Sequence, residues 1–132
     1  MSNSENLSKR KKIAGWVLTG LLALIFIPSA ISKLIAAANP TGEAYQKFVH
    51  YGLDGRVTLI GLGELITIIT FVFPKTSLIA VLFLSAHLGG AIVTHMEHGE
   101  NFVFQSVLLV IVWITQWLRD PNMFNTFRAP KL

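Results

Sequence analysis

Two side chains that can carry charge, Glu64 and His87, lie inside long apolar stretches of this sequence. Glu64 comes ten residues before Pro74, His87 comes eleven residues after Thr76, and the residues between form a predicted tight turn. In two antiparallel helices joined by that turn, both side chains would lie at the same depth, about 15 Å from the turn. A charged group near the middle of a membrane costs at least about 2.5–3.5 kcal/mol, so such residues usually face the protein interior and pair. We therefore predict that Glu64 and His87 face the inside of a helical bundle together.

Two further polar side chains could reach the same interior. Lys33 lies about 30 Å from Ile13 along a helix and shares a face with Ser29, one turn earlier. It is either a lysine that extends to the membrane surface or a cation presented to a cavity. His95 falls on the same face of its predicted helix as His87. Lys33, Glu64, His87 and His95 are predicted to line a small cavity that opens toward the outside.

Three chemical interpretations of this group stay open. The first is a structural hydrogen bond between protonated Glu64 and neutral His87. The second is the polar floor of a ligand cavity, for example for a quinone headgroup. The third is a proton or ion relay from Glu64 through His87 to His95, because paired titratable groups in different environments suit proton transfer.

Metal, haem and catalytic sites find little support. His95 and His98 are three residues apart near Glu97 and Glu100, but no third ligand follows at a defined spacing, so no metal is predicted. His87 has no histidine partner at its depth for haem. The sequence contains no cysteine, and it has no nucleophile elbow, phosphate loop or His-Glu-x-x-His motif. No catalytic residue is assigned.

The elements that would position these residues are four apolar blocks. Hydrophobic residues make up 52% of the 132-residue chain and charged residues only 14%, against about 25% charged in an ordinary soluble domain. Each block approaches the roughly 20 residues that cross a membrane. The blocks are residues 13–31, 57–73, 77–94 and 102–118. They predict an all-α fold, an integral membrane antiparallel four-helix bundle over residues 13–118.

Short segments flank and connect the predicted spans. Residues 1–12 form a basic N-terminal tail, of which residues 1–8 are expected to be disordered, and residues 119–132 form a polar C-terminal tail. Residues 43–51 are expected to form a short helix at the membrane surface. The apolar run continues past residues 29–31, which favours a retained first helix, loosened near Pro28, over a cleaved signal peptide.

The distribution of basic residues predicts the orientation. Eight of the 11 lysines and arginines fall on the side of both termini and three on the other side, so both termini should be cytoplasmic. The net charge of +4 and a pI near 9.7 do not indicate nucleic-acid binding, because the basic residues cluster at helix ends.

Small residues at helical spacing predict close helix packing. Gly61 and Gly63 flank Glu64 closely, and Ser85, Gly89 and Gly90 form stripes of small residues on the next helix. Such stripes let helices approach closely in lipid. A homo-oligomer is one arrangement that these stripes leave open.

Several sequence pieces together resemble the DoxX-like family of small four-helix bacterial membrane proteins. In chain order they are SAISKL at 29–34, a loop bearing Gly52, IGLGELI at 60–66, PKTSLI at 74–79 and LSAHLGGAIVTH at 84–95. The resemblance runs from residue 29 to about residue 102, more than half of the chain. Family patterns often have glycine at the position of Ala30 and an aromatic residue at that of His87. Lys33, Glu64 and His95 match family positions.

The resemblance implies a four-helix protein of the bacterial inner membrane. Some relatives are linked to quinone-coupled sulfur oxidation or to defence against oxidative stress. We therefore expect an accessory or small-molecule-binding component of a membrane redox system. Its candidate ligand is quinone, and its candidate partners are the lipid bilayer and a redox protein. A non-catalytic subunit of a quinone-linked oxidoreductase is the reading nearest to an enzyme.

Two other function classes stay open. One is a small proton-linked transporter or channel subunit, which the relay interpretation would serve. The other is a purely structural membrane interaction protein, in which Glu64 and His87 would only tie two helices together.

Overall fold

The chain is helical throughout its regular structure. A computed structural model describes residues 2–128 and 130. Its elements are α1 (Asn3–Ala38), α2 (Glu43–His50), α3 (Val57–Val72), α4 (Ser77–Glu97), α5 (Val103–Arg119) and a short 3-10 helix, η1 (Met123–Phe127). These residues contain five α-helices and no strand, which confirms the all-α prediction. Helices α1 and α4 are long and apolar enough to cross a membrane, and α3 and α5 are shorter apolar helices.

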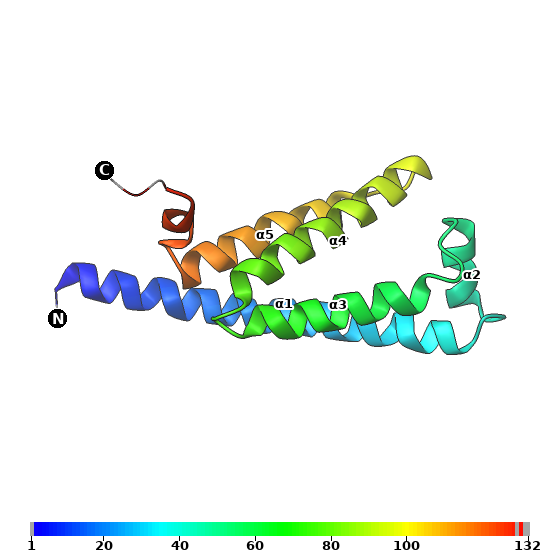
Figure 1. Cartoon of the computed structure of the whole chain (residues 1–132), viewed down its shortest axis with the longest axis horizontal. Coiled ribbons are helices and arrows are strands. Elements are labelled where there is room, and N and C mark those ends of the chain that lie inside the picture. The colour runs from blue at the N-terminus through cyan, green and yellow to red at the C-terminus, as the bar shows by residue number, and fades with distance from the viewer. Residues whose placement is uncertain (1, 129, 131–132) are drawn as a thin grey trace.

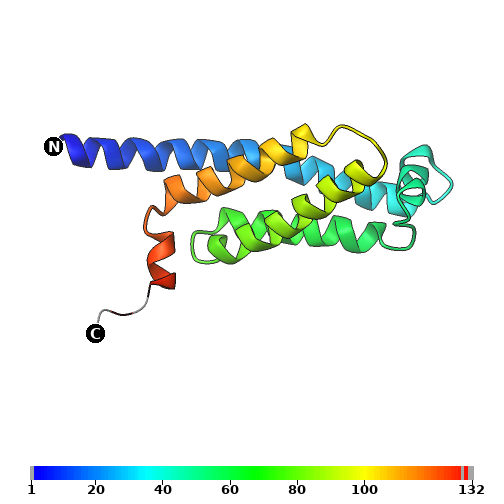
Figure 2. The ribbon, with the colours of Figure 1, turned by 90° about the horizontal axis from the view of Figure 1, so that it is seen from above.

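The four long helices form two pairs that diverge toward one end. Helix α1 packs along α3, and α4 packs along α5, while contacts of α1 with α5 and of α3 with α4 join the pairs. Figure 1 shows the pairs close together near the turn between α3 and α4 and farther apart toward α2, which lies at the wide end. Figure 2 shows the same helices from above. The space between the pairs is therefore widest beside α2.

The core fills the narrower part of this arrangement. Its fully buried apolar side chains come from all four long helices: Leu22 and Phe26 of α1, Ile68 and Phe71 of α3, Val81 and Leu84 of α4, and Leu108 and Val112 of α5. Many equally large apolar side chains point outward. These exposed side chains, together with two helices long and apolar enough to cross a membrane, point to a membrane protein.

Arg119, at the end of α5, connects the helices where the two pairs lie close together. Its guanidinium donates to the carbonyl oxygens of Phe71 (2.7 Å) and Val72 (3.0 Å) at the end of α3. It also lies 4.4 Å from the ring centroid of Trp16 on α1. Gly15 makes room for it, since a Cβ there would lie 2.8 Å from Arg119 Cγ. One side chain thus joins three helices.

Both predicted tails contain more structure than expected. Helix α1 begins at Asn3, because Ser2 and Glu5 form a reciprocal capping box, so the prediction of disorder over residues 1–8 is wrong for the described residues 2–8. The helix also continues through Pro28. After α5, η1 buries Met123 and stacks Phe124 on Trp113, with ring centroids 6.4 Å apart. Residues 1, 129, 131 and 132 lie outside the described part of the chain.

The predicted close packing is found at Gly61 and not at the other glycines of the stripes. A Cβ at Gly61 would lie 3.0 Å from Leu34 Cδ2 and 3.2 Å from Lys33 Cβ, so α3 approaches α1 closely there. A Cβ at Gly63, Gly89 or Gly90 would meet no other part of the described chain within 4 Å.

Ser85 has a bonding role as well as a packing one. Its hydroxyl donates to the carbonyl of Val81 at 2.7 Å and accepts a hydrogen bond from Trp113 Nε1 at 2.9 Å. Ser85 therefore ties α4 to α5.

Gly61→Ala and Gly63→Ala should have opposite effects on stability. The added methyl group at position 61 would overpack the contact with α1 and should cost about 1–3 kcal/mol. The same group at position 63 meets nothing and should stabilise α3 by up to about 1 kcal/mol. Unfolding of both variants in detergent micelles, followed by tryptophan fluorescence, checks this pair. Equal effects of the two substitutions would contradict the close approach at Gly61.

Candidate functional site

Three helices bring polar side chains to one point between the diverging pairs. These are Lys33 of α1, Glu64 of α3 and His87 of α4. Lys33 Nζ lies 2.7 Å from Glu64 Oε2, and His87 Nε2 lies 3.6 Å from the same oxygen. The Glu64 side chain is 1% exposed, whereas those of Lys33 and His87 are 17% and 22% exposed. The structure thus brings together three of the four side chains predicted for the cavity.

Lys33 points into the protein instead of along its outside. Its ammonium donates to Ser29 Oγ at 2.6 Å, one turn earlier, as helical side chains lean toward the N-terminus. The 2.7 Å contact with Glu64 is an ion pair by distance, although its direction is not aligned for a hydrogen bond. Lys33 was expected either to extend to the membrane surface or to present its charge to a cavity, and the structure agrees with the second.

The predicted hydrogen bond between Glu64 and His87 is not formed. Their separation of 3.6 Å exceeds the roughly 2.7–3.2 Å of such bonds. Glu64 Oε2 instead lies beside Lys33, which the turn spacing of α3 and α4 could not indicate. In the part of the chain that the structure describes, no hydrogen bond of the His87 ring is found.

These side chains form one wall of a cavity of about 710 Å³. Ligand pockets typically occupy about 300–1,000 Å³ and combine apolar walls with a few placed polar groups. The lining residues come from every long helix and from the end of α2: Ile25, Phe26, Ser29, Lys33, Phe48, Tyr51, Leu53, Ile60, Glu64, Ala86, His87, Leu88, Gly90, Ala91, Thr94, His95, Phe104, Gln105 and Leu108. We call this space the inner cavity.

His95, the fourth predicted side chain, lines the inner cavity apart from the other three. Its Nδ1 lies 2.6 Å from Glu100 Oε2, beyond the end of α4. Among the described residues, no hydrogen bond joins His87 to His95. The relay from Glu64 through His87 to His95 stays a hypothesis, with His87 beside Glu64 and His95 beside Glu100.

A tyrosine links the end of α2 to the residues that follow α4. Tyr51, at the end of α2, donates its hydroxyl to Glu100 Oε2 at 2.7 Å, so Tyr51 and His95 share one carboxylate oxygen. The hydrogen bond from Tyr51 is the main cause that lowers the pKa of Glu100. The same bond is the main cause that raises the pKa of Tyr51. At neutral pH the tyrosine is thus protonated and the glutamate ionised, as the bond requires. We call Tyr51, His95 and Glu100 the outer latch.

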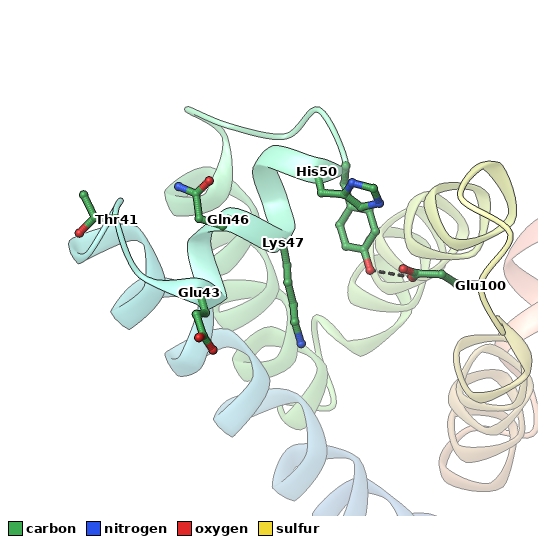
Figure 3. A pocket seen from close by; sticks show the side chains of 7 residues that line it. Thr41, Glu43, Gln46, Lys47, His50 and Glu100 are labelled. Atoms are coloured by element: carbon green, nitrogen blue, oxygen red, sulfur yellow. Dashed lines mark hydrogen bonds between the residues drawn. The ribbon is translucent and has the colours of Figure 1, made fainter.

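A second, more polar pocket of about 580 Å³ lies on the outer side of this latch. Figure 3 shows its side chains, with a dashed line for the hydrogen bond to Glu100. They are Thr41, Glu43, Gln46, Lys47, His50, Tyr51 and Glu100. Tyr51 therefore lines both pockets, which we distinguish as the inner cavity and the outer pocket.

The candidate metal ligands have other partners. His98 Nδ1 lies 2.8 Å from the carbonyl oxygen of Thr94, and its Nε2 lies 3.2 Å from that of His50. His95 faces Glu100. Within residues 2–128 and 130, no group of three or more histidine or acidic side chains could hold a metal ion. Both candidate histidines instead hold the wide end together.

Two lining residues were not singled out for chemistry by the sequence. Tyr51 has its partner 49 residues away, so no local spacing links the two. Gln105 of α5 has a buried Oε1 with no hydrogen-bond partner among the described residues. Its only sequence signal is an amide inside an apolar helix.

Comparison with known proteins gives one family. The model of the family described as the DoxX-like family matches residues 17–115, which include Lys33, Glu64, His87 and His95. No curated protein and no solved structure matches the chain. The family match covers well over half of the 132 residues. The chain therefore belongs to the DoxX-like family.

Proposed function

We propose that the protein is a multi-pass protein of the bacterial inner membrane, in which α1, α3, α4 and α5 form an antiparallel four-helix bundle. Their outward apolar side chains, such as Leu24, Leu59, Leu82 and Val110, suit contact with lipid. Both termini would be cytoplasmic by the distribution of lysine and arginine, and α2 would lie on the outer surface.

We propose further that the inner cavity binds a small amphipathic molecule with a quinone-like headgroup. The observation that carries this proposal is the cluster of Lys33, Glu64 and His87 in the lining of a largely apolar cavity. Lys33 and His87 are partly exposed and can donate hydrogen bonds to a carbonyl oxygen. The apolar walls would hold the attached chain. In this role the protein is an accessory component beside a redox protein.

Binding of decylubiquinone to the purified protein tests this function. Equilibrium titration should give saturable binding, and His87→Phe should weaken it about tenfold, the loss expected for one hydrogen bond. Glu64→Gln should weaken it similarly, because Lys33 loses the charge that positions it. Mass spectrometry of lipid extracts should find a quinone with the purified wild type and less with either variant.

Thr67→Val is the matched control. Thr67 lies on α3 one turn from Glu64 and is not a lining residue of the inner cavity, and its hydroxyl donates to the carbonyl of Gly63. The affinity of the Thr67→Val variant for decylubiquinone should equal that of the wild type. Unchanged binding in both Glu64→Gln and His87→Phe would refute the proposed site. Proton flux into liposomes that disappears in Glu64→Gln, without quinone binding, would favour the transporter.

A further inference from the structure

Tyr51 lines both the inner cavity and the outer pocket. We propose that the outer pocket is a vestibule to the inner cavity and that Tyr51 is the gate between them, held shut by Glu100. Polar headgroups would then reach Lys33 and His87 from the outer aqueous side. This inference rests on the proposed function only in taking the inner cavity as the binding site.

The gate is held by contacts between segments that are far apart in the sequence. The Tyr51 hydroxyl binds Glu100 at 2.7 Å, and the Tyr51 ring packs against His95 and His98, with ring centroids 5.7 and 5.1 Å away. These contacts join the end of α2 to the end of α4 across the wide end. Release of the Tyr51 hydroxyl would free the side chain that separates the two spaces.

The scaffold around the gate has its own support. His98 Nε2 lies 3.2 Å from the carbonyl oxygen of His50, and this contact does not involve the Tyr51 hydroxyl. The hydroxyl of Tyr45 accepts a hydrogen bond from the backbone of Gly55 at 3.0 Å. Helix α2 and the loop after it would therefore stay in place while Tyr51 turns. The moving part is one side chain.

The composition of the vestibule suits passage of a polar group. Lys47 and Glu43 line it with opposite charges, and His50 and Gln46 add further hydrogen-bonding groups. The inner cavity beyond Tyr51 is lined largely by apolar side chains. A molecule that enters headgroup first would leave a polar space and reach the polar cluster of Lys33, Glu64 and His87.

Cysteine accessibility tests the gate directly, because the chain contains no cysteine. Ala91→Cys places one thiol in the inner cavity, and 2-sulfonatoethyl methanethiosulfonate, which does not cross membranes, is applied outside right-side-out vesicles. Labelling should be slow with Tyr51 present. Tyr51→Phe and Glu100→Gln should each raise the rate about tenfold, as expected for loss of a hydrogen bond to a charged group. Tyr51→Ala should raise it further.

Two controls separate gating from general loosening. Thr41→Cys lies in the outer pocket and should be labelled at the same rate in every background. Val49→Ala shortens an exposed side chain of α2 that lines neither pocket, and it should leave labelling of Ala91→Cys unchanged. If Tyr51→Ala unfolds the protein, which the melting curve and Thr41→Cys labelling would reveal, the two conservative variants decide the result.

The possible failures of the two proposals are distinguishable. Labelling of Ala91→Cys that is equally slow in Tyr51→Phe and Glu100→Gln would overturn the gate, whatever the affinity for decylubiquinone in detergent. Fast labelling in these variants without any quinone binding would support the gate and refute the proposed ligand. Fast labelling already in the wild-type background would also overturn the gate.

Discussion

Replacing Lys33 by methionine is expected to destabilise the folded protein by about 3–5 kcal/mol, because the substitution leaves Glu64 buried without its cationic partner. Glu64 is 1% exposed, and Lys33 Nζ, at 2.7 Å, is its ion-pair partner. Methionine keeps the length and apolar stem of lysine, so the change removes little besides the charge. Chemical denaturation in detergent micelles, followed by the fluorescence of the three tryptophans, measures the loss.

The double variant Lys33→Met/Glu64→Gln should recover most of this loss, since neither charge then remains buried. The non-additive part of the cycle measures the coupling between the two residues. Lys47→Met on α2 is the matched control, because Lys47 is exposed and should change stability by no more than about 0.5 kcal/mol. Costs of the two single changes that simply add in the double variant would contradict the ion pair.

Arg119→Ala should produce a loss of at least about 3 kcal/mol, because two hydrogen bonds from a charged donor contribute about 1.5–3 kcal/mol each. The carbonyl oxygens of Phe71 and Val72 would lose their donor at the end of α3, and Trp16 would lose the guanidinium that lies over its ring. Arg119→Lys should recover little of the loss, because an ammonium lacks the planar fork that reaches both carbonyls. The melting temperatures of the wild type, Arg119→Ala and Arg119→Lys in detergent micelles measure these losses.

Arg128→Ala provides the comparison for Arg119. Arg128 follows η1 and its side chain is exposed, so its removal should leave the melting temperature nearly unchanged. If Arg119→Lys has the same melting temperature as the wild type, the positive charge alone is enough to stabilise the contact with the end of α3. A result in which Arg119→Ala and Arg128→Ala lose equal stability would argue against any clasp by Arg119.

The helices and the depth of the polar pair could be predicted because both follow from spacing. The apolar blocks gave α3, α4 and α5 to within a few residues, and α1 within a longer helix. Glu64 and His87 lie nearly equidistant from the turn between their helices, and the structure places them 3.6 Å apart. Spacing along the sequence does not determine the direction in which a side chain points. Lys33 could have extended to either side, and only the position of α3 selects the direction toward Glu64.

The contacts that close the two ends could not be predicted, for two physical reasons. Arg119 binds the backbone carbonyls of Phe71 and Val72, and a carbonyl is present at every residue, so no residue type reveals it. Tyr51 and Glu100 meet only because the helix pairs diverge and α2 lies across the gap, a property of the whole fold. Sequence spacing reports neighbours along one helix or across one turn, and both contacts exceed that range.

The tight contact of Gly15 with Arg119 has a mechanical consequence for the far end of the molecule. Arg119 binds the carbonyls at the end of α3, so this contact lies beside the turn where Figure 1 shows the two helix pairs close together, and the pairs extend from there as two arms toward α2. A shift of a fraction of an ångström there grows with distance along the arms. If a ligand binds the inner cavity as proposed, its affinity should respond to substitutions at Gly15 and Arg119, although neither residue lines that cavity.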